Sequence, residues 1–204
     1  MNLQKFKIVL PLLLFAGLFS KAQSFHHGQL IFSGGMDFAV YTVDTRDPVS
    51  DIRTSSKANS RIFPFAVELA MAENIGFGAE FRTNTFYHPK DTSTLKHKDY
   101  CLFLNYHFLR EEKFNLFLGI KYGVTDLHYD NSKTKNFFDA QGGQFQFQGG
   151  INLFITNGIG IQLHGGFNHL HYPKGKIIDP QGHEMPYKIY INGGEAGISL
   201  LLKM

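Results

Sequence analysis

Six ionisable residues are the strongest candidates for chemistry in this chain, because the other polar positions around them are mostly small or uncharged. Four acids and two bases at a similar depth predict a buried ion network. In that network Arg82, with its five donors, is expected to bridge the carboxylates of Glu68 and Glu80. A row of ionisable groups also suits a proton or ion path, so this alternative stays open. The six residues are Asp37, Glu68, Glu80, Arg82, Lys121 and Glu195.

Histidine is the second residue type that could do chemistry. His26 and His27 are adjacent near the start of the chain, whereas most of the other histidines are scattered. No spacing repeats a known zinc pattern, so neither a metal site nor another cofactor is expected. His107 and His164 fall near the six ionisable residues and are expected close to the network. The single cysteine excludes an intramolecular disulfide framework.

The elements that position these residues alternate apolar and polar side chains, which is typical of β-strands. Phe63, Phe65 and Val67 share one face of their segment, for example. No useful helical period follows the first 22 residues. Eight strands are predicted, at about 29–43, 61–72, 75–87, 99–110, 114–127, 143–155, 159–171 and 188–204.

The connections between these segments alternate in length. Short turns are expected at 73–74, 111–113 and 157–158, where Asn157-Gly158 is a strong hairpin signal. Long polar links are expected at about 45–60, 88–98, 128–142 and 172–187. Short turns at one end and long loops at the other predict an all-β fold, an eight-stranded antiparallel up-and-down barrel.

The polar face of the strands decides which side faces outward. A solvated surface usually carries roughly 25–35% charged residues, and this face holds few charges besides the six above. The opposite face is rich in Phe and Leu and suits lipid. Aromatic residues near the strand ends, such as Tyr100, Tyr172 and Phe154, fit the two girdles of a membrane barrel. These patterns favour a transmembrane β-barrel over a soluble one.

The first 22 residues look like a secretory signal peptide. Lys5 and Lys7 precede a short apolar run, and Ser20 and Ala22 supply the small residues of a cleavage site. The expected organisation is therefore a signal peptide at 1–22 and one barrel domain at 23–204. The formal charge of +3 falls to zero once the three lysines of the leader are removed, so no nucleic-acid partner is expected.

This combination of leader, eight strands, short turns and long loops resembles the small OmpA/OmpX-like outer-membrane β-barrel proteins. The resemblance implies a place in the bacterial outer membrane, among its lipids. The last segment, Ala196–Met204, is similar to the insertion signal of such barrels, although Met204 replaces the usual final aromatic residue. It implies the barrel-assembly machinery as a partner.

The expected function is that of a non-enzymatic barrel with a filled lumen. It would serve envelope integrity or surface interaction through four extracellular loops. Lysines and arginines of these loops could contact lipopolysaccharide, and the loops could also bind an extracellular or envelope protein. The alternative is a narrow channel. These basic residues are Arg46, Arg53, Lys57, Lys90, Lys96, Lys98, Lys133, Lys135, Lys174 and Lys176.

A lipid A-modifying barrel enzyme is the less favoured alternative. The segment Phe167–His171 faintly resembles the barrel lipid A deacylase family. That family has a serine two residues after its histidine, where this chain has His171 after His169. No catalytic residue is therefore expected.

Overall fold

Eight antiparallel strands close into one barrel in which each strand pairs with its sequence neighbour and β8 pairs with β1. This computed structural model describes residues 24–47, 50–87, 94–131, 136–178 and 184–204, so the expected signal peptide at 1–22 lies outside the described residues. The predicted up-and-down barrel is confirmed. The strands are β1 (Leu30–Arg46), β2 (Arg53–Ala70), β3 (Ile75–Tyr87), β4 (Thr94–Arg110), β5 (Phe114–Asn131), β6 (Asn136–Phe154), β7 (Ile159–Ile178) and β8 (Glu184–Lys203).

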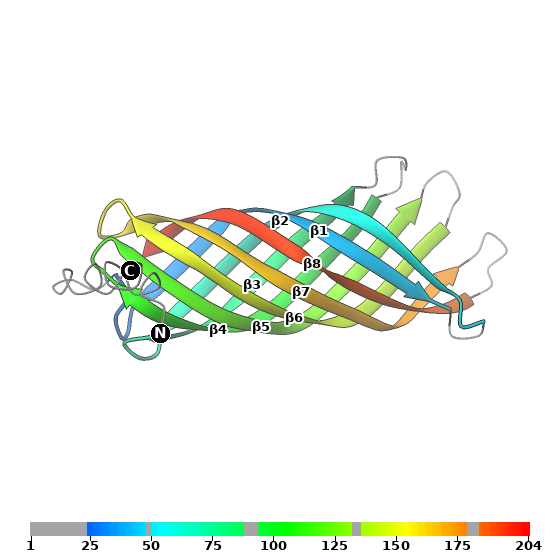
Figure 1. Cartoon of the computed structure of the whole chain (residues 1–204), viewed down its shortest axis with the longest axis horizontal. Coiled ribbons are helices and arrows are strands. Elements are labelled where there is room, and N and C mark those ends of the chain that lie inside the picture. Colours follow the sequence, from blue (N-terminus) through cyan, green and yellow to red (C-terminus); the bar gives the residue numbers. More distant parts are fainter. Residues whose placement is uncertain (1–23, 48–49, 88–93, 132–135, 179–183) are drawn as a thin grey trace, which may run out of the picture.

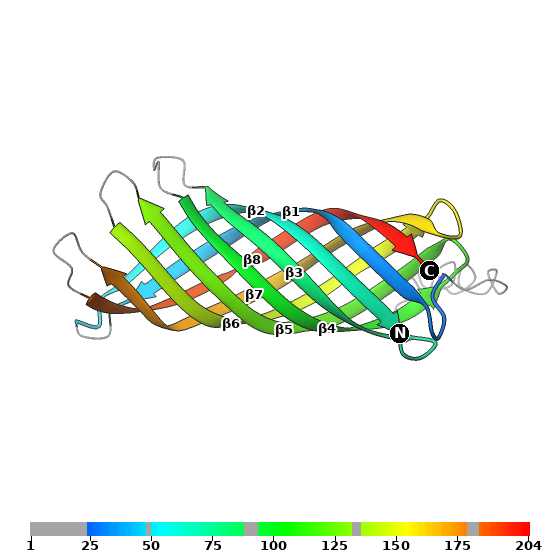
Figure 2. The ribbon, with the colours of Figure 1, turned by 180° about the vertical axis from the view of Figure 1, so that it is seen from behind.

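The barrel is elongated, with tilted strands and two different ends (Figure 1). Three short turns lie at one end, between β2 and β3, β4 and β5, and β6 and β7. Leu30 and Met204 exchange two backbone hydrogen bonds at the same end. We call this the turn end and the opposite one the loop end. Figure 2 shows from behind that the opposite ends of β1 to β8 all lie at the loop end.

The links at the loop end are shorter than predicted because the strands continue further. β2 begins at Arg53 instead of about residue 61, and β7 ends at Ile178 instead of about residue 171. The prediction of long loops is therefore wrong. The extra strand residues keep the same alternation of inward and outward positions but carry polar side chains outward: Lys96 and Lys98 are exposed, whereas His97 and Asp99 point inward and are buried. Where the strands extend beyond the bilayer, their outer face contacts water, so its side chains are polar.

A band of apolar side chains surrounds the barrel between its turn end and these extensions. Phe65, Phe81, Tyr100 and Val124 are exposed register partners on four adjacent strands. About 9–11 tilted residues suffice to cross a bilayer, yet most strands have 17 to 20. The remainder forms what we call the collar, comprising 41–46, 53–62, 82–87, 94–99, 125–131, 136–143, 168–178 and 184–193.

The interior has three layers. An apolar cluster within the collar includes Tyr41, Phe86 and Leu170. A second apolar cluster at the turn end includes Phe25 and Phe154. Polar and charged side chains fill the space between them, and this central layer holds the predicted ion network.

Candidate functional site: the ion network inside the barrel

The side chains of all six residues singled out in the sequence point into the barrel and are buried. The strands place them there because each lies at an inward position of the two-residue period. The exposed fraction ranges from 0% for Arg82 to 9% for Glu80. The structure divides them among several clusters, which also recruit residues that the sequence did not indicate.

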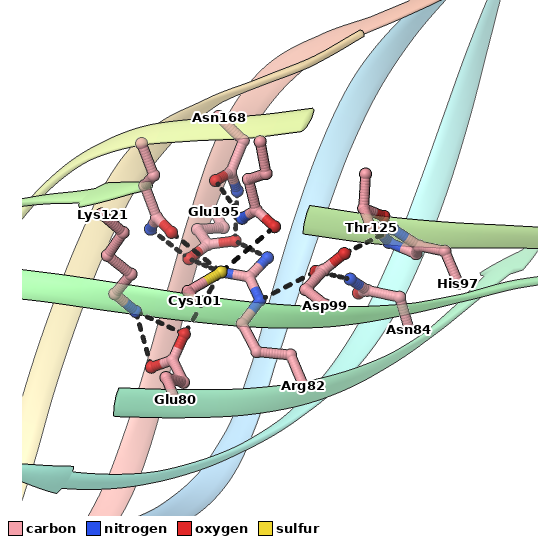
Figure 3. A network of polar contacts seen from close by, with 12 residues as sticks. Glu80, Arg82, Asn84, His97, Asp99, Cys101, Lys121, Thr125, Asn168 and Glu195 are labelled. Atoms are coloured by element: carbon pink, nitrogen blue, oxygen red, sulfur yellow. Dashed lines mark hydrogen bonds and ion pairs between the residues drawn. The ribbon is translucent and has the colours of Figure 1, made fainter. Parts of the chain in front are cut away.

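Arg82 of β3 is the centre of the largest cluster, seen in Figure 3. Its Nη1 and Nη2 donate to the two carboxylate oxygens of Glu195, each at 3.1 Å. Its Nε lies 3.3 Å from Asp99 Oδ2, and its Nη1 donates to Gln146 Oε1 at 2.8 Å. Asn168 and Gln146 also donate to Glu195. One guanidinium thus joins β3, β4, β6 and β8 across the lumen.

Glu80 and Glu68 find partners other than Arg82. Lys121 Nζ donates to both oxygens of Glu80 at 2.7 and 2.6 Å. Glu68 Oε1 accepts from Asn105 at 3.1 Å and lies 2.9 Å from His107 Nε2. Arg82 approaches Glu80 only at 3.8 Å.

The prediction that Arg82 bridges Glu68 and Glu80 is therefore wrong. The register pairs Glu80 with Ala66 and Glu68 with Gly78, so the two glutamates are diagonal rather than opposite. Both glutamates have their partners on strands two positions away, Glu80 on β5 and Glu68 on β4, because a narrow barrel packs its side chains across the interior.

Asp37 is separate from the Arg82 cluster. His164 Nε2 lies 3.0 Å from Asp37 Oδ1, linking β7 to β1. His107 and His164 were expected near the network, and both lie inside it. Tyr172 and Phe154 were expected in the outer aromatic girdles, but they are buried inside with exposed fractions of 0% and 4%.

Asp99 and His97 are the main members that the sequence did not indicate. His97 Nδ1 lies 3.1 Å from Asp99 Oδ1, and Asn84 donates to Asp99 Oδ2 at 3.2 Å. Thr125 Oγ1 lies 3.2 Å from His97 Nδ1. His97 was missed because it falls within the expected loop at 88–98, and Asp99 because it is the first residue of the strand predicted at 99–110. Their two-residue spacing from Cys101 and Phe103 is the signal that could have revealed them.

Inward glycines make room for these long side chains. A Cβ on Gly76 would collide with the carboxylate of Glu68, and one on Gly197 would collide with that of Asp37. Little open volume remains. A small cavity of about 20 Å³ lies in the turn half of the lumen, beside Glu68, Glu80, Lys121 and His164. A cavity of this size holds about one water molecule.

The chain before β1 closes the turn end. Phe25 is fully buried and stacks on His107, with ring centroids 3.7 Å apart and an interplanar angle of 16°. Ser24 bonds through its backbone N–H to Glu111 O and through Oγ to Phe114 O. Gly28 has φ of 82°, a conformation that glycine tolerates and other residues rarely adopt. The lumen is thus covered on the side of the termini.

The collar bears charges that meet water. Arg46 Nε lies 2.5 Å from Asp51 Oδ1, and this partner lowers the pKa of the Asp51 carboxyl. His171 stacks on Tyr190 at 4.5 Å. Partial burial lowers the pKa of His171, and the nearby charges of His169 and Lys188 lower it further.

Among the residues that the structure describes, no group of three or more His, Cys, Asp or Glu side chains could hold a metal ion. No helix within those ranges is long and apolar enough to cross a membrane. His169 is exposed and bonds Asn192, whereas Ser199 is buried on β8, seven residues further towards the turn end. The two do not meet.

A closed eight-stranded barrel with an apolar outer band defines the class of protein, a transmembrane β-barrel of the bacterial outer membrane. Its fold is that of the small OmpA/OmpX-like barrels, as the sequence predicted. No family model matches the chain, and no curated protein matches it.

Several solved structures have a fold similar to that of this chain. The outer membrane protein OprG from Pseudomonas aeruginosa aligns over 90% of this chain and 99% of its own, with 12% identity and a TM-score of 0.64. The outer membrane protein AlkL, solved in DMPC lipid bilayers, aligns over 91% and 94%, with 15% identity and a TM-score of 0.56. At these identities the likeness shows the fold alone.

One comparison corrects the expectation that this chain is not an enzyme. The outer membrane protease OmpT from Escherichia coli aligns over 86% of this chain and 97% of its own, with 9% identity and a TM-score of 0.50. A barrel of similar shape thus belongs to an enzyme. The expectation rested on the missing serine of one barrel enzyme family, and that absence does not bear on other catalytic groups, which can be placed on a barrel without changing its fold.

Proposed function

We propose that this outer-membrane barrel acts through its outer surface, in envelope integrity or surface interaction, rather than by conducting solutes through its lumen. The observation that carries the proposal is the contrast between a filled interior and an extended, charged collar. The Arg82 cluster spans the lumen, and Phe25 covers its turn end. The collar projects beyond the apolar band with lysines and arginines exposed.

The orientation follows from the same contrast. With both termini in the periplasm, the collar and its four links face the outside of the cell, where they meet lipopolysaccharide or a partner protein. The long loops expected from the sequence are replaced by strand, so the surface for such contacts is mostly the collar wall. Removal of residues 1–22 and insertion by the barrel-assembly machinery through the β8 terminus belong to this proposal.

Single-channel recording in planar bilayers tests the proposal. The purified barrel is expected to show no stable conductance above background, because an eight-stranded barrel is only wide enough for its own side chains. A matched variant, Arg82→Ala with Glu195→Ala, removes the central cluster and tests whether the assay detects an opened lumen. A reproducible open state of the parent protein would contradict the proposal and favour the narrow channel.

A further inference from the structure

The collar carries one concentration of positive charge that the ion network does not use. Arg61 of β2, Lys96 and Lys98 of β4 are all exposed and lie on neighbouring parts of the outer wall. Thr83 and Thr85 of β3 lie between them, since Arg61 pairs with Thr85 and Thr85 pairs with Lys96. We call these five residues the basic patch.

The register fixes the spacing of the basic patch. Adjacent strands are about 4.8 Å apart, so the backbones at Arg61 and Lys96 are about 10 Å apart across Thr85. Lys96 and Lys98 are two residues apart on one face, which is about 7 Å. Side chains of this length can converge from both sides on one anionic group, with the threonine hydroxyls beneath it as additional donors.

The basic patch keeps an excess of positive charge. Asp126 on β5 is the register partner of Lys98, so one carboxylate lies on the strand beside the three cations. Within the described ranges no ion pair joins Arg61, Lys96 or Lys98 to a carboxylate, whereas Arg46 and His128 each have an aspartate partner. The guanidinium of Arg61 lies over the ring of Tyr87, with 5.5 Å from Cζ to the ring centroid, which directs it along the outer wall.

The height of the basic patch on the barrel identifies its partner. The next outward row towards the turn end is Phe65, Phe81 and Tyr100, which belongs to the apolar band. The cations therefore begin where the hydrocarbon ends, at the level of lipid headgroups. A ligand that suits this place has acyl chains beside the apolar row and an anionic group one step above them.

We infer that the basic patch binds a phosphate of a phosphorylated glycolipid of the outer leaflet, lipopolysaccharide. This inference rests on the proposed outer-surface function and names the partner of that surface. Lysine and arginine beside an anionic membrane surface each favour binding, and phosphate accepts charge-assisted hydrogen bonds from both. The acyl chains would lie against Phe65, Phe81 and Tyr100.

The test compares two double variants with equal loss of charge. Lys96→Gln with Lys98→Gln removes two cations of the basic patch, and Lys174→Gln with Lys188→Gln removes two exposed lysines from β7 and β8 across the barrel. Each protein is held in phosphatidylcholine nanodiscs and titrated with purified lipopolysaccharide or with dephosphorylated lipopolysaccharide. Binding is measured by microscale thermophoresis, and folding is checked by circular dichroism.

The patch variant is expected to bind lipopolysaccharide about tenfold or more weakly than the parent, and the control within about threefold of it. The parent is expected to prefer the phosphorylated form by a similar factor. Equal losses in the two variants would overturn the inference, and so would equal affinity of the parent for both lipid forms. Neither outcome depends on conductance, so failure of this inference is distinguishable from failure of the proposed function.

Discussion

Arg82 shows how a single residue organises the interior. It lies within ion-pair distance of Glu80, Asp99 and Glu195, and it is fully buried. Burial of charge is costly unless partners satisfy it, so the free energy of this cluster depends on keeping both signs present. The cost of burying the Glu195 carboxylate is offset by the hydrogen bonds that it accepts from Arg82, Gln146 and Asn168.

Arg82→Gln is expected to lower the free energy of unfolding by about 3–5 kcal/mol, because it leaves Glu195 and Asp99 buried without their cation. Urea unfolding of the refolded barrel in detergent measures the loss. Arg61→Gln, at an exposed arginine of the adjacent strand, is the control and is expected to change stability by no more than about 0.5 kcal/mol. Adding Glu195→Gln to Arg82→Gln is expected to recover part of the loss. If Arg82→Gln matches the parent, the cluster contributes nothing to stability.

His171 predicts a small pH dependence of stability. Its pKa is lowered by burial and by the charges of His169 and Lys188, so the folded barrel binds this proton less readily than the unfolded chain. A histidine in an unfolded chain titrates near pH ~6.5. Stability is therefore lost as the pH falls through that range.

His171→Gln is expected to reduce the difference in urea stability between about pH 7.5 and 5.5, by at most about 0.5 kcal/mol because surface charges are screened. Lys188→Gln is expected to reduce it less, since burial is the larger cause. An unchanged pH dependence in His171→Gln would show that this histidine does not titrate differently in the folded barrel.

At the scale of elements, the outward face of β4 changes from apolar to polar along one strand, while inward and outward positions keep the same two-residue alternation. Leu102 and Leu104 point outward to lipid, whereas His97 and Asp99 point inward beneath the exposed Lys96 and Lys98. The outward side chains match their surroundings: they are apolar where the strand faces lipid and polar where it faces water.

This change in the outward face explains what the sequence could predict. Within the apolar band one rule holds, so the strand cores, the inward position of the six ionisable residues and the barrel closure followed from periodicity. In the collar the outward side chains are polar, and its parts at 53–60, 94–98, 128–131, 136–142 and 172–178 were interpreted as loop. The partners of Arg82 could not be predicted, because they depend on the stagger of strands far apart in sequence. Glu195 is 113 positions from Arg82.

The segment before β1 is a separate element with its own stability. Phe25→Ala is expected to release Ser24–Gln29 from the turn end, because it removes the ring that stacks on His107. Local opening should appear as faster hydrogen exchange at the amides of Gly28 and Ala70, which bond Ala70 O and Gln29 O.

Phe63→Ala is the matched control for that measurement, since Phe63 is an exposed phenylalanine of the outer band. It is expected to leave exchange at Gly28 and Ala70 unchanged. Amides in the middle of the strands should stay protected in both variants. Equal exchange of Gly28 in Phe25→Ala and the parent would mean that the stacked ring does not hold the segment.

At the scale of the whole molecule, three regions of the barrel have different roles. The apolar band fixes the barrel in lipid, the central network fills it, and the collar presents charge outside. Closure links them, because β8 pairs with β1 from Ile31–Lys203 to Arg46–Lys188. A sheet closed in this way has no free edge and satisfies its backbone groups within the bilayer.

Closure predicts heat-modifiable migration in SDS gels. The folded barrel is expected to resist SDS at room temperature and to run faster than the boiled, unfolded chain, because unfolding requires breaking the whole circular ladder at once. A variant lacking 196–204 loses most of the β1–β8 pairing within the apolar band and is expected to run at the same position with or without boiling. Identical migration of the full chain before and after boiling, together with full solubility in detergent-free buffer, would contradict a closed membrane barrel.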